Sequence, residues 1–304
     1  MSVNTLEYAA IFMAELDHQL VEGSTTGWME ENAGQVLYSG GAEVKIPKMQ
    51  MSGLGNYDRD GGFAKGAVTV SYETKELTQD RGRTFQLDAM DVDETNFAAM
   101  AGNVMGEFQR TKVIPEIDAY RYSKIAELAK VASKTRNYVP AVDTIFEKLM
   151  NDITEVRDTA GECAELVIAM SAKVAGMLDL AKGGTNVLQG GVFLQGNAEL
   201  KVKEIDGCPI IRVPSARFRT KYSFLDGVTD TAGGFAAAAD AEAINWMILA
   251  KNAPVAVSKT DVTRIFDPMT NQNANAWKID YRKYHDLWIM DNGMDGVLVS
   301  INHA

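Results

Sequence analysis

The sequence has three histidines, and none of them stands in a pattern that metal binding or catalysis would require. His18, His285 and His303 share no metal-ligand spacing. A catalytic triad would have to use His285, which stands beside Asp286 in the strand-like run RKYHDLW. For His285 we therefore predict a structural or solvent-facing role.

The segment Asp58-Arg59-Asp60-Gly61 begins like the calcium loop of an EF-hand. Such a loop needs a glutamate at its twelfth position to complete the set of ligands. Counted from Asp58, that position is Thr69. The segment therefore predicts a glycine-aspartate turn and no calcium site.

Other residue types that carry chemistry are also placed without a site pattern. The glycines at 53–55 and 183–196 match neither GxGxxG nor GxxxxGKS/T, so no phosphate-binding loop is predicted. Cys163 and Cys208 form no CxxC pair, which argues against a zinc or redox motif and is typical of reduced cysteines in a cytosolic protein. We predict no catalytic residue, no metal and no cofactor.

The composition is that of an acidic globular protein with a substantial core. The 304 residues are 46% hydrophobic and carry a formal net charge of -11. An acidic surface repels phosphate backbones and anionic lipids, which disfavours a dedicated nucleic-acid grip, although the charge also serves solubility. The N-terminus has no signal-peptide pattern, and no window is apolar enough to span a membrane. We expect a protein made and used in a cytoplasm.

The first twenty residues predict an amphipathic helix that ends at the flexible run Gly23–Gly27. Its apolar positions recur at helical spacing: Leu6, Ala9, Ala10, Met13, Leu16 and Leu20. A short helix this isolated needs a surface to lie on. That surface belongs either to its own domain or to a neighbouring subunit.

Residues 36–90 predict strands and a long hairpin. A strand is expected around 42–51, and a glycine-rich loop follows it. Apolar and polar residues alternate over 68–73 and again over 83–88, with a turn expected at 78–82. We therefore predict a hairpin between these two runs. A bare two-stranded ribbon is only marginally stable in water, so another surface must cover it.

The rest of the chain predicts a long helix, a mixed middle region and closing strands. The helix spans about 93–134 and is bent or divided at Pro115. The middle region predicts helices at 140–158 and 172–182, strands at 165–170 and 243–250, a hairpin turning at 206–207, and an exposed loop at 229–242. Strands are expected at 255–257, 262–266, 277–282, 287–290 and 297–301.

The order of these pieces resembles the major capsid proteins of tailed bacteriophages, which share the Hong Kong 97 type fold with encapsulins. KELTQDRGRTFQLDAMDVDET resembles the passage from extended loop to spine helix, and VIPEIDAYRYSKIAELA resembles the spine helix itself. ELVIAMSAKVAGMLDLA and IDGCPIIRVPSARF resemble parts of the axial domain. The resemblance implies an α+β fold with an N-terminal arm (1–35), an extended β-hairpin loop or E-loop (36–90), a spine helix of the peripheral (P) domain (91–136), an axial (A) domain (137–255) and C-terminal strands mostly of the P domain (256–304).

The resemblance also implies a structural function. The chain would assemble as hexamers and pentamers into an icosahedral or prolate shell around double-stranded DNA, without sequence-specific DNA binding and without a membrane. It would be a virion capsid component assembled in the cytoplasm of a bacterial host. Its partners would be itself, a portal, decoration proteins and a separate scaffolding protein or none, since Met1 leads almost directly into the arm. No lysine-asparagine cross-link is predicted.

Six residues are predicted to contact neighbouring subunits: Leu6, Met13 and Leu20 on the arm, and Lys75, Arg81 and Arg83 in the extended loop. The two arginines flank Gly82 at the expected hairpin tip, where a planar guanidinium suits a carboxylate of a neighbour; the other interpretation is that both are solvated. Two alternatives to a phage capsid remain open. One is an encapsulin-like shell around cargo enzymes, and the other is an α/β hydrolase or transferase with an unrecognised acidic site.

Overall fold

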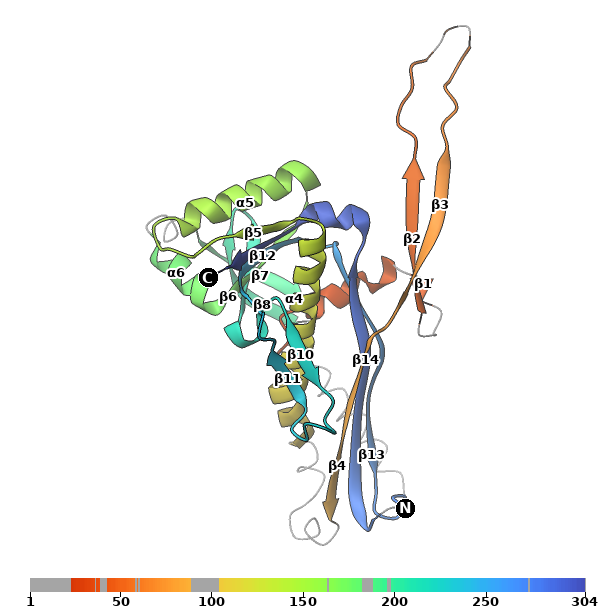
Figure 1. Cartoon of the computed structure of the whole chain (residues 1–304), viewed down its shortest axis with the longest axis vertical. Coiled ribbons are helices and arrows are strands. Elements are labelled where there is room, and N and C mark those ends of the chain that lie inside the picture. The colour runs from red at the N-terminus through yellow and green to blue at the C-terminus, as the bar shows by residue number, and fades with distance from the viewer. Residues whose placement is uncertain are drawn as a thin grey trace.

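The computed structural model describes residues 23–35, 37–38, 43–57, 59, 61–88, 104–162, 164–181, 188–195, 198–272 and 274–303. The predicted arm helix, with Leu6, Met13 and Leu20, lies outside these residues, and so does the predicted start of the long helix before Val104. The described part has a compact body from which one ribbon projects at one end and a second, longer ribbon runs to the other end (Figure 1).

The body is built on a seven-stranded sheet with the strand order β5-β15-β12-β6-β9-β8-β7. The strands are β5 (Thr135–Asn137), β6 (Leu166–Ser171), β7 (Gln189–Gln195), β8 (Ala198–Ile205), β9 (Cys208–Val213), β12 (Ala243–Ala250) and β15 (Val297–Asn302). The β6/β9 and β5/β15 pairs are parallel, and the others are antiparallel. Helices α5 (Ile145–Ala160) and α6 (Ala172–Leu180) pack against each other and against this sheet.

Several sequence predictions are confirmed in this body. Strands β6 and β12 are almost wholly buried, as their continuous apolar runs indicate. Strands β8 and β9 form the predicted hairpin, in which Asp206 and Gly207 both have positive φ, as a tight hairpin turn requires. Helix α5 begins at Ile145 and not, as predicted, at Pro140. The residues 142–144 before it form a turn.

The segment 229–242, predicted to be an exposed loop, contains a strand. Strand β11 (Gly234–Ala237) pairs antiparallel with β10 (Tyr222–Leu225), and the two form a separate two-stranded sheet. The run of small residues around β11 lacks the β-branched pattern that would mark a strand. Its hairpin partner and the contacts described below hold it in place.

A three-stranded antiparallel sheet forms the long ribbon, with the order β13-β14-β4. Its strands are β13 (Pro254–Phe266), β14 (Ala276–Ile289) and β4 (Gln79–Asp88). One side of this ribbon packs on the helical segment 105–117, through a cluster of Met105, Val113, Ile117, Ile279 and Tyr281. Strand β15, in contrast, returns to the seven-stranded sheet, so the C-terminal strands are divided between two sheets.

The predicted hairpin between 68–73 and 83–88 is wrong. Strand β3 (Val68–Glu76) pairs with β2 (Glu43–Met51), while β4 pairs with β14 along its whole length. The chain is extended at 78–82, where the turn was expected. It is held in place there because Leu77 is buried and Asp286 accepts hydrogen bonds from the N–H and hydroxyl of Thr78. Period-two alternation identifies a strand but does not identify its partner.

A short β1 (Leu37–Tyr38) pairs with the root of β2, and the 3-10 helix η1 (Gly27–Gln35) precedes it. The projecting hairpin therefore consists of β2, β3 and the connection between them (Figure 1).

The long helix continues through Pro115 without a break. Residues 104–108 are helical, a π turn (η2, Gln109–Val113) follows, and α4 runs over Ile114–Val131. Proline has no N–H for a hydrogen bond to the preceding turn. The helix accommodates it with a wider turn, in which the N–H of Ile114 donates to the carbonyl of Gln109.

The segment before η1 is fastened to α4 by one fully buried carboxylate, Asp118. It accepts hydrogen bonds from the hydroxyls of Ser24 (3.0 Å), Thr25 (3.0 Å) and Thr26 (2.7 Å). The backbone N–H of Thr25 also donates to it, and Arg217 forms an ion pair with it at 3.1 Å. A buried charge is tolerated only when it is paired and hydrogen-bonded, so this cluster fixes where residues 24–26 cross the helix.

Replacing Asp118 by alanine should therefore cost about 3–5 kcal/mol of unfolding free energy, because it leaves Arg217, two buried donors and two part-buried donors without their acceptor. Urea unfolding of the unassembled subunit measures this loss. The matched control is Glu147→Gln, which removes an exposed carboxylate charge on α5 and should have little effect. Equal stability of Asp118→Ala and the control would refute the role assigned to the cluster.

Candidate assembly surface

The projecting hairpin has two chemically different sides, defined by its register. Directly paired residues share a side of an antiparallel ribbon. One side carries Val44, Ile46, Lys48 and Gln50 of β2 with Lys75, Glu73, Ser71 and Thr69 of β3. The other side carries three successive apolar pairs: Pro47 with Tyr72, Met49 with Val70, and Met51 with Val68.

The first side attaches the hairpin to the body. Val44 and Ile46 are buried with Leu77 in a cluster completed by Val255, Val257 and Trp288 of the long ribbon. Further out, Lys48 pairs with Asp291 in the 3-10 helix η4 (Asp291–Gly296). Beyond that point this side is polar, as a solvated strand face should be.

The second side, which we call the apolar face (Pro47, Met49, Met51, Val68, Val70 and Tyr72), is exposed. Met51 and Val68 are 70% and 65% exposed, and Met49, Val70 and Tyr72 are each more than half exposed. Because the root is buried through the other side of the ribbon, the apolar face points away from the surface to which the hairpin is attached. Among the described residues, no side chain covers it.

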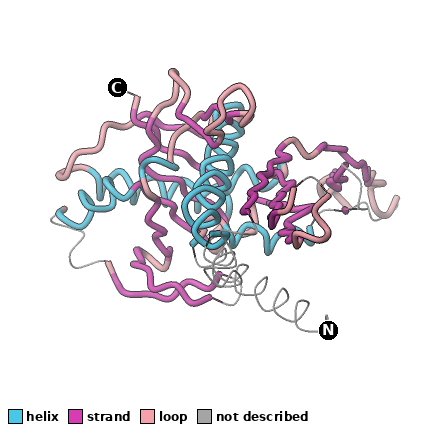
Figure 2. The backbone as a smooth tube through the Cα atoms, turned by 90° about the horizontal axis from the view of Figure 1, so that it is seen from below, coloured by secondary structure: helices cyan, strands magenta, loops and turns pink. Residues whose placement is uncertain are grey.

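The apolar surface continues into the connection between the two strands. Leu54 and Phe63 are almost fully exposed, and the rings of Tyr57 and Phe63 meet edge to face at 4.9 Å. A monomeric soluble protein rarely presents a contiguous apolar surface of this kind. The views along and across the long axis both show the hairpin standing clear of the body (Figures 1 and 2).

Three of the residues predicted to contact a neighbouring subunit, Lys75, Arg81 and Arg83, do not lie at the tip of a projecting hairpin. Lys75 lies at the root of β3, on the attached side, where it pairs with Glu73 at 2.5 Å. Arg81 and Arg83 lie in β4 and not at a hairpin tip, so their predicted location is wrong. A contact of Lys75, Arg81 or Arg83 with a neighbouring subunit stays a prediction.

Sequence reasoning missed half of the apolar face. The alternation of Val68, Val70 and Tyr72 predicts the strand correctly, but the predicted partner of that strand is wrong. The run Pro47-Lys48-Met49-Gln50-Met51 has the same alternation, and it could have indicated the true pairing. Pro47 obscures this signal because proline is depleted in strands and tolerated chiefly at edges.

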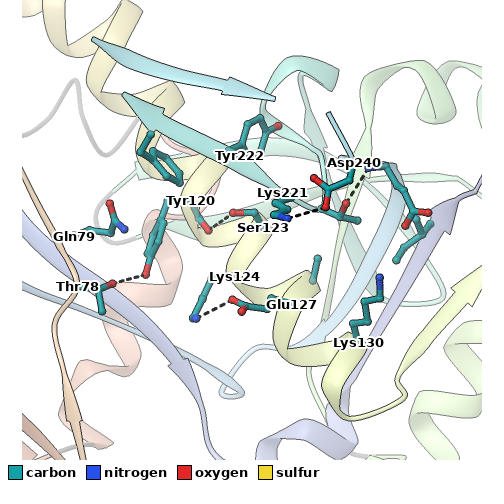
Figure 3. Close-up of a pocket in the computed structure, with 15 residues that line it drawn as sticks. Thr78, Gln79, Tyr120, Ser123, Lys124, Glu127, Lys130, Lys221, Tyr222 and Asp240 are labelled. Carbon is teal, nitrogen blue, oxygen red and sulfur yellow. Dashed lines mark hydrogen bonds and ion pairs between the residues drawn. The ribbon is translucent and has the colours of Figure 1, made fainter. Parts of the chain in front are cut away.

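A groove of about 700 Å³ lies between α4 and the segment leading into β10 (Figure 3). Its carboxylates form ion pairs: Glu127 pairs with Lys124 at 2.8 Å, Asp240 with Lys221 at 2.7 Å, and Glu242 with His303.

No group of acidic, histidine or cysteine side chains suited to a metal occurs among the described residues. No helix in the described part of the chain is long and apolar enough to cross a membrane.

His285 is buried, which fits the structural one of its two predicted roles and not the solvent-facing one. It is 4% exposed and its ring meets that of Tyr120 at 5.5 Å. Burial, together with the positive charges of Arg121 and Lys283, lowers its pKa well below the usual value. The adjacent Asp286 accepts hydrogen bonds from Tyr120 and Thr78. The Nδ1 atom of His285, to which a triad carboxylate would bind, has no hydrogen-bond partner among the described residues.

No protein-family model matches the sequence, and no curated protein matches it. Solved structures do match the fold. The capsid of the cyanophage P-SCSP1u gives a TM-score of 0.58 at 11% identity, covering 88% of this chain and 85% of that one. The asymmetric unit of the bacteriophage PhiM1 mature capsid gives 0.56 at 13% identity, covering 86% and 82%.

A virus-like particle from Pyrococcus furiosus is also similar, with a TM-score of 0.51 at 11% identity over 94% of this chain and 96% of that one. In all three comparisons the similarity extends over most of both chains. The present structure has a projecting hairpin, a long helix and a mixed seven-stranded sheet. The chain therefore has the α+β capsid fold of the Hong Kong 97 type, as the sequence resemblance indicated.

Proposed function

We propose that this chain is a major capsid protein of a tailed bacteriophage, which assembles as hexamers and pentamers into an icosahedral or prolate shell around double-stranded DNA. The observation that carries the proposal is the exposed apolar face of the projecting hairpin. The capsid fold supports the same function, since the similar proteins from PhiM1 and P-SCSP1u are capsid proteins by description.

Nothing in the described part of the chain covers the apolar face, and the proposal assigns that role to a neighbouring subunit. A two-stranded ribbon is marginally stable alone, and here its root is held while its outer part is bare. Covering the face with a neighbouring copy removes apolar side chains from water, worth about 1.5–3 kcal/mol for each one fully buried. A head-to-tail contact that repeats from subunit to subunit forms a ring when the rotation between neighbours closes, and a ring is the geometry of a capsomer.

The remaining partners and the location follow from the same proposal. Portal, decoration and scaffolding proteins would bind the assembled shell, and assembly would take place in a bacterial cytoplasm. An encapsulin-like cargo shell is a second candidate, supported by the similarity to the Pyrococcus furiosus particle. An enzyme with an acidic site receives less support, because the carboxylates of the groove in Figure 3 are held in ion pairs.

Charging the apolar face should prevent assembly. The variant Met49→Glu with Val70→Lys places an ion pair at one cross-strand position without changing the net charge. Loss of two buried side chains should raise the protein concentration needed for shell formation by about a hundredfold or more. Electron microscopy and light scattering measure this, and the melting temperature of the unassembled subunit should stay close to that of the wild type.

The matched control is Gln50→Glu with Thr69→Lys, which introduces the same charges at the neighbouring pair on the polar side. It should form regular shells. Normal shells from the Met49/Val70 variant, or equal loss in both variants, would show that the apolar face is not the interface. A wild-type chain that stays monomeric, alone and with its scaffold, would overturn the proposed function itself.

Removing residues 1–22 should impair assembly and spare the fold. The predicted amphipathic helix ends before Gly23, and the Asp118 cluster holds residues 24–26 without it. The melting temperature of the truncated subunit should stay close to that of the full chain, while micrographs show few regular shells. Shells of normal yield and size would show that this segment is not an assembly element.

The contents of the particles distinguish the two kinds of shell. Particles isolated from the native bacterial system should protect double-stranded DNA from nuclease, because a phage capsid encloses its genome. Gel analysis of nuclease-treated particles measures this directly. Particles that hold an enzyme and no protected DNA would identify a cargo shell instead.

A further inference from the structure

Arg81 joins three elements of the subunit through a single guanidinium. Its Nε donates to Glu116 in the first turn of α4 at 2.6 Å. Its Nη1 and Nη2 donate to the carbonyls of Leu225 (2.8 Å) and Gly234 (3.2 Å). These two residues are directly paired at the loop end of the β10–β11 hairpin, so Arg81 binds both of its strands at once.

Arg83 holds the loop of the same hairpin. Its Nη2 donates to the carbonyl of Thr231 at 2.9 Å. The loop backbone passes so close that a Cβ on Gly227 or Gly233 would lie 2.9 Å or 3.4 Å from Nη1 of Arg83. Both glycines also have positive φ, which other residues rarely adopt. The loop is thus shaped to fit the arginine.

Hydrogen bonds within the loop of the β10–β11 hairpin also fix its conformation. Asp226 accepts hydrogen bonds from the backbone N–H groups of Val228 and Thr229 and from the Thr229 hydroxyl. These bonds, the Val228 N–H first, lower the pKa of Asp226 to about 2. Below the loop, the ring of Phe224 meets that of Tyr120 on α4 edge to face at 5.7 Å.

The hairpin spans the groove described above. At its attached end, the N–H of Thr220 donates to the carbonyl of Glu242, next to β12 of the seven-stranded sheet. At its loop end it meets β4 of the three-stranded sheet through Arg81 and Arg83. Between the two ends, Tyr222 and Lys221 face Tyr120 and Ser123 of α4 across the groove (Figure 3).

We propose that Arg81 and Arg83 form a latch that fixes the orientation of the seven-stranded sheet relative to the three-stranded sheet, and that this orientation sets the curvature of the shell. The inference rests on the proposed function. A two-stranded hairpin has little stability of its own, so its position depends on what holds its ends. In a repeating assembly a small change of angle in each subunit changes the size at which the shell closes. The arginines are positioning residues that act within one subunit.

The test uses the full chain with Arg81→Gln and Arg83→Gln. Hydrogen exchange of the unassembled subunit should show the amides of residues 222–237 exchanging about tenfold or more faster, because charge-assisted hydrogen bonds are lost. Exchange in β6 and β12 should not change. Electron micrographs of assembled material should show a broader range of particle diameters than the wild type, including tubes or open sheets.

The matched control is Arg282→Gln, which removes an exposed arginine of the same sheet that pairs with Asp80 of β4. It should change neither readout. A milder variant, Glu116→Gln, removes the carboxylate that orients Arg81 and keeps the test informative if the double variant does not fold. It should raise exchange in the hairpin by a smaller factor.

Two results would overturn the proposal. Unchanged exchange at 222–237 in both latch variants would show that the arginines do not hold the hairpin. Faster exchange with a particle diameter distribution equal to that of the control would show that the hairpin does not set curvature. Failure of the wild type to assemble would count against the proposed function and leave the exchange test of the latch intact.

Discussion

The burial of α4 on nearly every side forces its charged side chains to find partners inside the protein. Asp118 and Arg121 are both almost fully buried. Ser24, Thr25 and Thr26 supply the partners of the first, and Glu30 pairs with the second. Burial alone would raise the pKa of Glu30, but the charges of Arg121 and Lys283 lower it to about 2, so the carboxylate stays ionised. The path of residues 24–30 across the helix is therefore fixed by electrostatics.

The position of the projecting hairpin follows from that path. Residues 27–35 form η1, and the side chain of Asn32 donates to the carbonyls of Lys251 and Pro254 at the start of β13. The chain then enters β1 and β2, whose root is buried against the same strand. A ribbon with its base held in this way has a defined direction, while its outer apolar face stays uncovered. The described residues thus satisfy these buried charges internally and leave the apolar face without a cover, which is the basis of the proposed contact with a neighbour.

Sequence reasoning predicted most elements and missed how two of them pair. The continuous apolar runs of β6 and β12 and the Asp-Gly turn between β8 and β9 specify their structures locally, and these predictions are confirmed. Strand β3 pairs with β2 and not with β4, which follows it in the chain, and alternation alone does not decide between these two partners. The small residues of β11 carry no strand signal of their own. A hydrogen bond from Arg81, which is far away in the sequence, holds this strand at Gly234. For the same reason the sequence indicates only the β3 half of the apolar face, because the pairing of β3 with β2 is not predicted.

The two proposals share one stretch of chain. Strand β3, which carries half of the apolar face, continues through the buried Leu77 and the anchored Thr78 directly into β4, which carries Arg81. The segment between the interface and the latch is short, extended and held at both residues, so it has little freedom to absorb a change at either end. A neighbour that redirects the hairpin therefore acts on the strand whose arginines hold β10–β11. Discrete contacts of this kind transmit a change better than a flexible linker would, because packed and hydrogen-bonded elements move between a few arrangements and do not deform continuously. The proposed interface and the proposed latch are thus joined by one short stretch of extended chain.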